Sequence, residues 1–200
     1  MNKSLAIIGA GGHGKVVGEI ALLNRFKVID FFDDKKKSID EKFIFPIKGT
    51  TENLEKILDN YDNFFVAIGN NEERKKKYNH FVKLKMNSIN LIHPKSTVSK
   101  YVNYGKGICI MANAVINPGT SIGDGVIINT SASVDHDCII ERFSHISPNC
   151  SLSGGVKLGQ LSHIGTGTSL HPNIKIGNNV KIGIGSKVFK DIPNNAIFKS

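Results

Sequence analysis

The segment from Ile110 to Leu152 reads IMANAVINPGTSIGDGVIINTSASVDHDCIIERFSHISPNCSL and has an aliphatic residue at every sixth position. The same period runs from Ile92 to Val188, and only Tyr104 interrupts it. A period of six is neither the 3.6 of an α-helix nor the 2 of an ordinary strand; it is typical of a parallel β-helix, in which each hexapeptide supplies one short strand and one corner. We therefore expect residues 92–200 to form a left-handed parallel β-helix. Its coils of about 18 residues should stack at the ~4.8 Å spacing of sheet strands.

Residues 1–91 follow a different pattern, in which short apolar segments alternate with helical ones. The expected strands are residues 4–9, 26–32, 64–68 and 88–91, and the expected helices are residues 12–23, 53–58 and 71–85. Such alternation predicts a parallel sheet. We expect an α/β, Rossmann-like half domain over residues 1–91, large enough for one mononucleotide.

Composition narrows the class of protein. The chain has 200 residues, of which 40% are apolar and 22% charged, and it shows neither a signal-peptide pattern nor an apolar segment of about 20 residues. We expect a cytoplasmic protein without membrane insertion. Cys138 and Cys150 fall in core positions of the repeat and are expected to be core fillers.

The formal net charge of +9 could suggest a nucleic-acid partner. However, the lysines occur in runs such as 35–37 and 75–77, and no nucleic-acid motif accompanies them. We expect a solvated basic surface and no nucleic acid, with attraction of small polyanions as the alternative.

A glycine-rich loop, Gly9-Ala10-Gly11-Gly12-His13-Gly14, joins the first expected strand and helix. Asp33 and Asp34 follow about 20 residues later. Such glycines let backbone N–H groups approach a phosphate, and such acids hold a ribose or base. A purely structural turn is the alternative. A P-loop kinase or ATPase is poorly supported, because Val16 stands where a magnesium-binding Ser or Thr belongs. An NAD-dependent enzyme is poorly supported as well, because the second mononucleotide-binding half is missing.

Four histidines decorate the expected solenoid: His136, His145, His163 and His171. His136 lies between Asp135 and Asp137, two residues after a core position, where an imidazole beside carboxylates is placed to act as a general base. A surface histidine in a polar turn is the alternative. His145 and His163 are one coil apart, but Ile127 and Lys181 occupy the same column on either side, so we expect no metal site.

His136 and His145 are nine residues apart, which is half a coil, so they should lie on different faces. They can join one site only if different subunits contribute them. Apolar residues at expected outward positions suggest side-by-side packing, namely Ile127, Ile139, Phe143 and Leu161. We therefore expect a homotrimer.

Together with Ala67-Ile68-Gly69-Asn70-Asn71, the glycine-rich loop, the paired aspartates and the Asp135-His136-Asp137 corner resemble the bacterial sugar O-/N-acyltransferase family. The resemblance covers essentially the whole chain. It is closest to the N-acetyltransferases of nucleotide-linked 4-amino sugars, such as the enzyme of bacillosamine synthesis. It implies a homotrimer with active sites at subunit interfaces, acetyl-coenzyme A as co-substrate and a role in surface glycan synthesis.

The resemblance also implies roles for individual residues. His136 would be the catalytic base and Asp137 its partner. The nucleotide-sugar, with UDP expected, would contact Gly11, Gly12, His13, Asp33, Asp34 and Gly69. Acetyl-coenzyme A would contact His145, Thr166 and Ile184.

The expected reaction is direct acetyl transfer to the C4 amine of a 4-amino-4,6-dideoxy sugar, with backbone N–H groups around Gly154-Gly155 stabilising the oxyanion. Two alternatives remain open at this point. One is O-acetylation of a sialic acid or another hydroxyl; the other is a β-helix module that binds nucleotides without chemistry.

Overall fold

The computed structural model describes residues 4–35 and 43–199. The chain divides into two compact units, Met1–Leu91 and Ile92–Ser200. Within the described residues, no helix is both long enough and apolar enough to cross a membrane.

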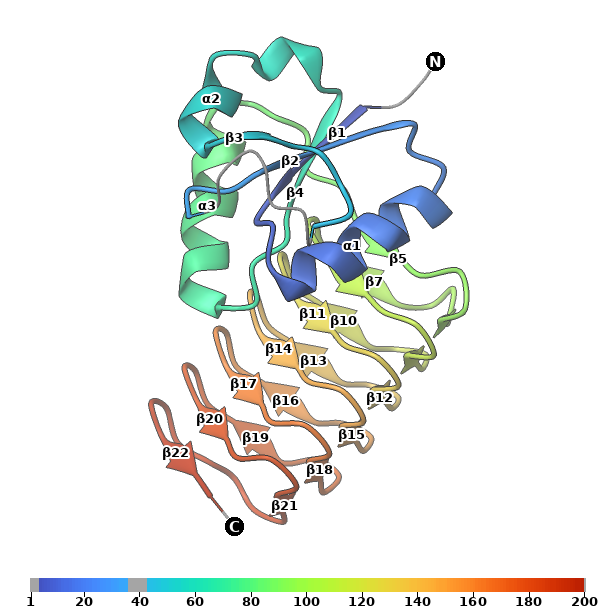
Figure 1. Ribbon diagram of the computed structural model, residues 1–200. Coiled ribbons are helices and arrows are strands. Elements are labelled where there is room, and N and C mark those ends of the chain that lie inside the picture. Colours follow the sequence, from blue (N-terminus) through green and yellow to red (C-terminus); the bar gives the residue numbers. More distant parts are fainter. Residues whose placement is uncertain (1–3, 36–42, 200) are drawn as a thin grey trace. The chain divides into compact units, whose positions relative to one another are not determined.

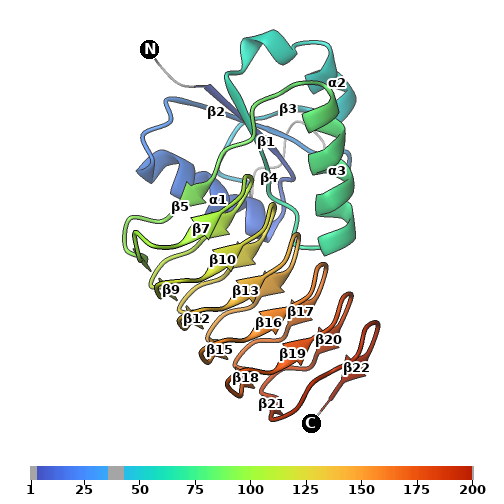
Figure 2. The same ribbon diagram turned by 180° about the vertical axis from the view of Figure 1, so that it is seen from behind.

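The first unit contains a parallel sheet of four strands in the order β3-β2-β1-β4. Helix α1 lies on one side of this sheet, and α2 and α3 lie on the other (Figures 1 and 2). The bounds are β1 Ser4–Ile8, β2 Val28–Phe32, β3 Ile47–Gly49, β4 Asn63–Val66, α1 Gly12–Leu23, α2 Thr51–Glu55, α3 Asn71–Lys83 and a 3₁₀ turn, η1, at Leu58–Asn60.

The glycine at the end of β1 is required by the backbone. Gly9 has φ +107°, and a Cβ there would lie 2.8 Å from the carbonyl oxygen of Ala67. Only glycine adopts this conformation without strain, so the chain can leave the sheet here and enter α1. Gly14 is needed for another reason, since a Cβ on it would clash with the carbonyl oxygen of Gly9.

Some expected elements of this unit were wrong in detail. Strand β3 was not anticipated, and the helix expected over residues 53–58 is α2 followed by η1. The capping box at Thr50 explains the early start of α2, because the Thr50 hydroxyl accepts from the Asn53 N–H. The strand expected over residues 88–91 is a single bridge between Ser88 and Phe64, followed by β5. In the lysine run 35–37, residues 36 and 37 lie outside the described residues.

The second unit is a left-handed parallel β-helix, as the hexapeptide period predicted. Strands β5 to β22 have two residues each, and up to β21 the second residue is the member of the six-residue series. The strands are β5 Leu91–Ile92, β6 Thr97–Val98, β7 Asn103–Tyr104, β8 Cys109–Ile110, β9 Val115–Ile116, β10 Ser121–Ile122, β11 Ile127–Ile128, β12 Ser133–Val134, β13 Ile139–Ile140, β14 His145–Ile146, β15 Ser151–Leu152, β16 Lys157–Leu158, β17 His163–Ile164, β18 Ser169–Leu170, β19 Lys175–Ile176, β20 Lys181–Ile182, β21 Lys187–Val188 and β22 Ile197–Phe198.

Each of these strands pairs in parallel with the strand one coil away, so three stacked sheets form the faces of the solenoid (Figures 1 and 2). For example, Ser121 pairs with Ile139 and Ile127 pairs with His145, an offset of 18 residues in both cases. The aliphatic series fills the interior as one continuous buried column. Each coil is therefore stabilised mainly by its neighbours.

The corners of the solenoid carry residues in the left-handed region. At the corner that follows β9, β12, β15 and β18, these residues are Gly119, Asp137, Gly155 and Asn173. Gly, Asn and Asp tolerate this conformation better than other residues. The side chain of Asp137 thus occupies a position that the backbone restricts to a few residue types.

Two of the apolar residues expected to face outward are buried. Ile127 is 1% exposed and so is Phe143, whose ring lies where a Cβ on Gly125 would be. Ile139 remains exposed and Leu161 is half-buried. The three cysteines are buried, as the repeat predicted for Cys138 and Cys150.

Candidate functional site

A pocket of about 500 Å³ lies in the first unit, at the carboxyl ends of β1, β2 and β4. Its lining includes all six residues that were expected to contact the nucleotide-sugar: Gly11, Gly12, His13, Asp33, Asp34 and Gly69. Ligands of parallel α/β sheets bind at this edge of the sheet. The pocket therefore brings together, in one cavity, residues from three separate segments of the chain.

The glycines of this pocket differ in what they do for the fold. A Cβ on Gly11, Gly12 or Gly69 would meet no atom within 4 Å, so the packing of the chain does not demand glycine there. Helix α1 starts at this point with Gly11 as its N-cap, without a side-chain cap and without an acid in its first turn. Its first N–H groups carry the positive end of the helix dipole and suit an anion.

Helix α3, which also contributes to the pocket, is already capped. The Asn70 side chain accepts from the N–H of Glu73 at 3.0 Å, and Glu72 and Glu73 occupy the first turn of α3. These acids complement the dipole of α3 and leave α1 as the helix with the free positive end.

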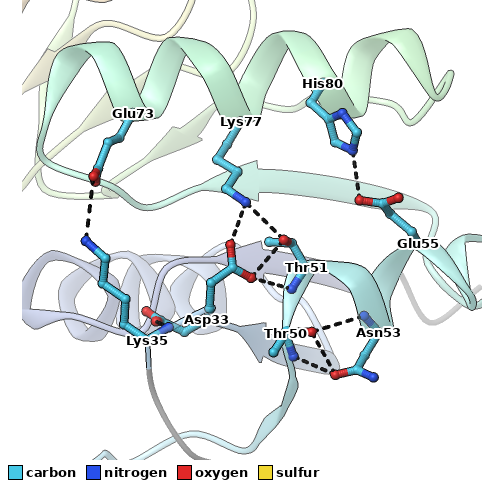
Figure 3. A network of polar contacts seen from close by, with 10 residues as sticks. Asp33, Lys35, Thr50, Thr51, Asn53, Glu55, Glu73, Lys77 and His80 are labelled. Atoms are coloured by element: carbon cyan, nitrogen blue, oxygen red, sulfur yellow. Dashed lines mark hydrogen bonds and ion pairs between the residues drawn. The ribbon is translucent and has the colours of Figure 1, made fainter.

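The two aspartates hold the pocket together from inside. Asp33 accepts from the N–H of Ala10 at 2.7 Å and thereby fixes the glycine-rich loop. Asp34 accepts from the N–H and the hydroxyl of Thr51, both at 2.8 Å, and its other oxygen lies 2.6 Å from Nζ of Lys77. Figure 3 shows this network, in which Lys77 also donates to the Thr51 hydroxyl and Lys35 pairs with Glu73 at 3.6 Å.

The Asp34 carboxylate is held in its charged form. Burial opposes ionisation, but the hydrogen bonds from Lys77 and Thr51 outweigh it and hold the pKa of Asp34 below its ordinary value. Neither Lys77 nor Thr51 was anticipated as part of the site. Lys77 and Thr51 lie 43 and 17 residues from Asp34, on α3 and α2. The α/β unit has no repeat that would place residues so far apart in sequence next to each other.

His13 is neutral at physiological pH. Burial and the nearby charge of Arg74 lower its pKa to about 4, and its Nε2 atom is buried without a hydrogen-bond partner. A neutral imidazole offers one donor and one acceptor. His13 therefore suits polar contact with a ligand rather than ion pairing.

The second unit presents His136 at the corner between β12 and β13, with 61% of its side chain exposed. Its Nδ1 lies 2.8 Å from Oδ2 of Asp137. This contact places the proton on Nδ1 and leaves a lone pair on Nε2. The hydrogen bond to Asp137 raises the pKa of His136 above its ordinary value, and the charge of Asp135 adds to the effect.

The backbone on both sides of His136 is fixed by neighbouring coils. Asp135 accepts from the Asn117 side chain and from the N–H of His136, each at 2.8 Å, and the hydrogen bond from Asn117 is the main reason that its pKa is lowered. The carbonyl oxygen of His136 accepts from the N–H of Gly155 at 2.9 Å. This last bond corrects one expectation, because the Gly155 N–H is engaged and is not available to an oxyanion.

The ring of His136 lies directly over Gly154 of the next coil. A Cβ on Gly154 would lie 2.6 Å from both Cε1 and Nε2 of His136. That separation is far below van der Waals contact, so any larger residue at this position would displace the ring. Gly154 is a position where close approach requires glycine.

His145 lies on a different face from the His136 corner, within β14. Its ring stacks on that of His163, with centroids 4.6 Å apart and planes 10° from parallel. The Asn129 amide nitrogen lies 3.2 Å from Nε2 of His145, and the Asn129 oxygen accepts from the N–H of Thr130. The amide is thereby oriented as a donor to Nε2 of His145.

Thr166 and Ile184 occupy a third location. They lie one coil apart at the corner that follows β17 and β20, where the N–H of Gly185 donates to the carbonyl oxygen of Thr166. Ile184 is 80% exposed. One chain therefore presents His136 at the corner between β12 and β13, His145 on the face that does not border this corner, and this pair at another corner. Among the residues described, no group of three His, Cys, Asp or Glu side chains could hold a metal ion.

Comparison with known proteins relates both units to one group of enzymes. Residues 4–81 match the model of the PglD N-terminal domain. The acetyltransferase domain of PglB from Neisseria gonorrhoeae FA1090, solved in complex with acetyl coenzyme A, is 40% identical. The match covers 100% of this chain and 97% of that one, with a TM-score of 0.94. The chain belongs to the bacterial sugar O-/N-acyltransferase family.

Two further members of this sugar acyltransferase family set the range of similarity. A variant of perosamine N-acetyltransferase from Caulobacter crescentus, in complex with CoA and GDP-perosamine, is 32% identical over 100% of this chain and 95% of that chain, with a TM-score of 0.95. UDP-N-acetylbacillosamine N-acetyltransferase of Bacillus subtilis (strain 168) is 40% identical over 114 residues. That alignment spans 55% of this chain and 52% of the Bacillus protein, about half of each.

Besides Lys77 and Thr51, a third residue of this sugar acyltransferase was not anticipated from the sequence. Arg74 is 1% exposed and lies directly behind the wall of the pocket. A signal existed, because Arg74 shares the spacing i, i+4, i+7 with Tyr78 and Phe81, which are also buried on α3. A charged residue on the buried face of a helix indicates a specific polar role.

Proposed function

We propose that this chain is an acetyl-coenzyme A-dependent N-acetyltransferase that acetylates the C4 amine of a nucleotide-linked 4-amino-4,6-dideoxy sugar, with UDP as the nucleotide. The observation that carries the proposal is the 2.8 Å contact between His136 Nδ1 and Asp137 Oδ2 at a corner of the solenoid. An oriented imidazole with an open Nε2 is the group that an amine nucleophile needs. The relatives crystallised with acetyl coenzyme A or with CoA and GDP-perosamine support the two substrates.

In the proposed reaction, the sugar amine attacks the thioester carbonyl carbon. Nε2 of His136 takes one proton from the nitrogen as the C–N bond forms. The C–S bond then breaks, and the CoA thiolate leaves and takes up a proton. Asp137 keeps the ring oriented and stabilises its positive charge, as a carboxylate does for a catalytic histidine.

A covalent acetyl-enzyme is not part of this proposal. Cys138 and Cys150 are buried in the solenoid core, and burial raises the pKa of both thiols. A protonated, inaccessible thiol is a poor nucleophile. Because Gly155 is engaged, the N–H of Gly154 is the member of the Gly154-Gly155 pair that we propose for oxyanion stabilisation.

For the acceptor, we propose that the diphosphate binds at the start of α1 and that the nucleoside lies toward Asp33 and Asp34. Gly11, Gly12 and Gly69 leave open space that the fold itself does not require, and such space suits close approach of a phosphate to backbone N–H groups. For the donor, we propose contacts to His145, Thr166 and Ile184.

We further propose that the active site is shared between copies in a homotrimer. His136 lies at one corner of a coil, whereas His145 belongs to a different sheet and Thr166 and Ile184 to another corner. Mixing inactive His136→Ala chains with inactive His145→Ala chains should restore activity, because some mixed interfaces would have both residues intact. Recovery no greater than the sum of the two variants would overturn sharing.

The direct test is an acetyl-transfer assay with UDP-, GDP- and dTDP-linked 4-amino-4,6-dideoxy sugars, following CoA thiol release and product mass. We expect turnover with the UDP-linked amine, and none with the matching sugar that carries a hydroxyl at C4. Transfer to the hydroxyl alone would replace the proposal by O-acetylation. Absence of transfer to any acceptor, together with no thermal stabilisation by acetyl coenzyme A, would reject an enzymatic role.

A further inference from the structure

Arg74 is a buried cation behind the pocket, and the proposed reaction does not use it. Arg74 is 1% exposed and is among the largest fully buried side chains of the described residues. It lies four residues after the N-cap Asn70 on α3. Burial of an arginine is costly unless its donors are satisfied, so its retention at this position calls for a reason.

The guanidinium is held against the loop between β4 and α3. Its Nη1 donates to the carbonyl oxygens of Ile68 and Gly69, each at 3.0 Å, and its Nη2 donates to Oδ1 of Asn71 at 2.8 Å. Ile68 and Gly69 line the pocket, whereas Arg74 is not among the lining residues. The guanidinium therefore lies behind the pocket wall, and it donates hydrogen bonds to backbone carbonyl oxygens of that wall.

Two consequences follow for an anion in the pocket. The carbonyl oxygens of Ile68 and Gly69 are directed at Arg74, so their negative ends do not face a phosphate. In addition, a positive charge is fixed behind the wall, where low dielectric lets it act more strongly than a solvated lysine. Burial is the main cause of the low pKa of His13 in the glycine-rich loop, and the charge of Arg74 lowers this pKa further.

We propose that Arg74 is a positioning residue for the diphosphate of the nucleotide-sugar: it turns two wall carbonyls away from the pocket and supplies a buried positive charge behind it. This inference rests on the proposed nucleotide pocket. It extends the set of specificity-determining groups to a residue that need not touch the ligand.

The test compares UDP with uridine, and GDP with guanosine in parallel, on the full chain. Arg74→Met should weaken diphosphate binding about tenfold or more and nucleoside binding less than threefold, measured by titration calorimetry. The matched control is Lys75→Gln, which removes a positive charge from the adjacent position of α3. Like Arg74, Lys75 does not line the pocket. The control should bind all four ligands within about twofold of the unaltered chain.

Equal losses for nucleotide and nucleoside would mean that Arg74 only shapes the loop, and no loss would mean that it has no part in binding; either result overturns the inference. If Arg74→Met does not fold, Arg74→Gln keeps a donor while removing the charge and is judged by the same comparison. A nuclear magnetic resonance titration should also show a higher pKa for His13 in the folded variant. Failure of the unaltered chain to bind either diphosphate would instead reject the nucleotide pocket itself.

Discussion

The pocket of the first unit and the His136 corner of the second are built in opposite ways. The pocket is preorganised, because the ion pair of Asp34 and Lys77 joins two distant segments of its wall and the buried Arg74 fixes the loop between β4 and α3. The corner is exposed, and His136 depends on its neighbour Asp137 and on the coil beneath it. A binding site can be completed within one chain, whereas an exposed base needs further surface to exclude water from the reaction. The two halves of the proposed reaction therefore depend on different kinds of structure, and each half can be disturbed separately.

The largest effect is expected from removing the base. His136→Asn should lower kcat by about 10²- to 10⁴-fold, since a positioned general base typically contributes that much. KM for both substrates should stay within about threefold, because the pocket in the first unit is untouched. Steady-state kinetics and the melting temperature check this, and turnover near that of the unaltered chain would remove His136 from the mechanism.

The next effect tests the coil beneath the ring. Gly154→Ala should lower kcat about 10- to 100-fold, because the new Cβ would lie 2.6 Å from the His136 ring and displace it. Gly183→Ala is the matched control, since a Cβ there would meet the nearest atom at an ordinary 3.5 Å. Equal kinetics of the two variants would show that the position of the ring over Gly154 is unimportant.

A third change tests how Asp137 affects the basicity of His136. Asp137→Asn should reduce kcat about tenfold and lower the pKa of His136, because its main stabilising hydrogen bond to a carboxylate is lost. The active form of a base is the unprotonated one, so the acid limb of the kcat/KM profile should move to lower pH. If the acid limb of the kcat/KM profile did not move, the titrating group behind that limb would not be His136.

On the pocket side, Gly11→Ala should weaken UDP binding about tenfold without lowering the melting temperature, because the Cβ meets no protein atom but projects into the space that a phosphate would fill. Gly14→Ala makes the contrasting variant, since its Cβ clashes with the Gly9 carbonyl and should destabilise the fold. A Gly11→Ala chain that binds UDP normally would move the diphosphate away from the start of α1.

The smallest effect concerns the ion pair beside the pocket. Lys77→Met should cost about 1 kcal/mol or less of unfolding free energy, because the side chains of Lys77 and Asp34 are 27% and 43% exposed. The pKa of Asp34 is lowered in the folded chain, so its contribution is present above the unfolded pKa and is lost as pH falls through the folded one. Denaturant unfolding of the single and double variants with Asp34→Asn should give a coupling that disappears in acid, and additive losses would contradict it.

The strands of the solenoid up to β21 could be predicted because their period is a direct property of the residue order, whereas β22 lies outside that period. The α/β unit was predictable as an alternating pattern, but β3 was not, since three residues after Pro46 carry no periodic signal. The burial of Phe143 was missed because it depends on the space over Gly125, a contact between corners of different coils. Residues of the candidate pocket were predictable where a motif contained them, as with Gly11 and Asp33. Arg74 could have been recognised from its spacing with Tyr78 and Phe81, whereas the position of Lys77 depends on a tertiary contact that no local pattern specifies.

The offset of 18 residues between paired strands has a consequence for how such a chain can change length. Adding or deleting one residue at a corner would rotate every later side chain out of its column, so core residues would face water and the aligned corners would separate. Adding or deleting a complete coil would preserve every column. Natural or designed variants of this solenoid should therefore differ mainly in whole coils. Shorter changes should be confined to corners that return the chain to the same phase, as in the last coil, where Lys181 pairs with Ile197 at an offset of 16 residues.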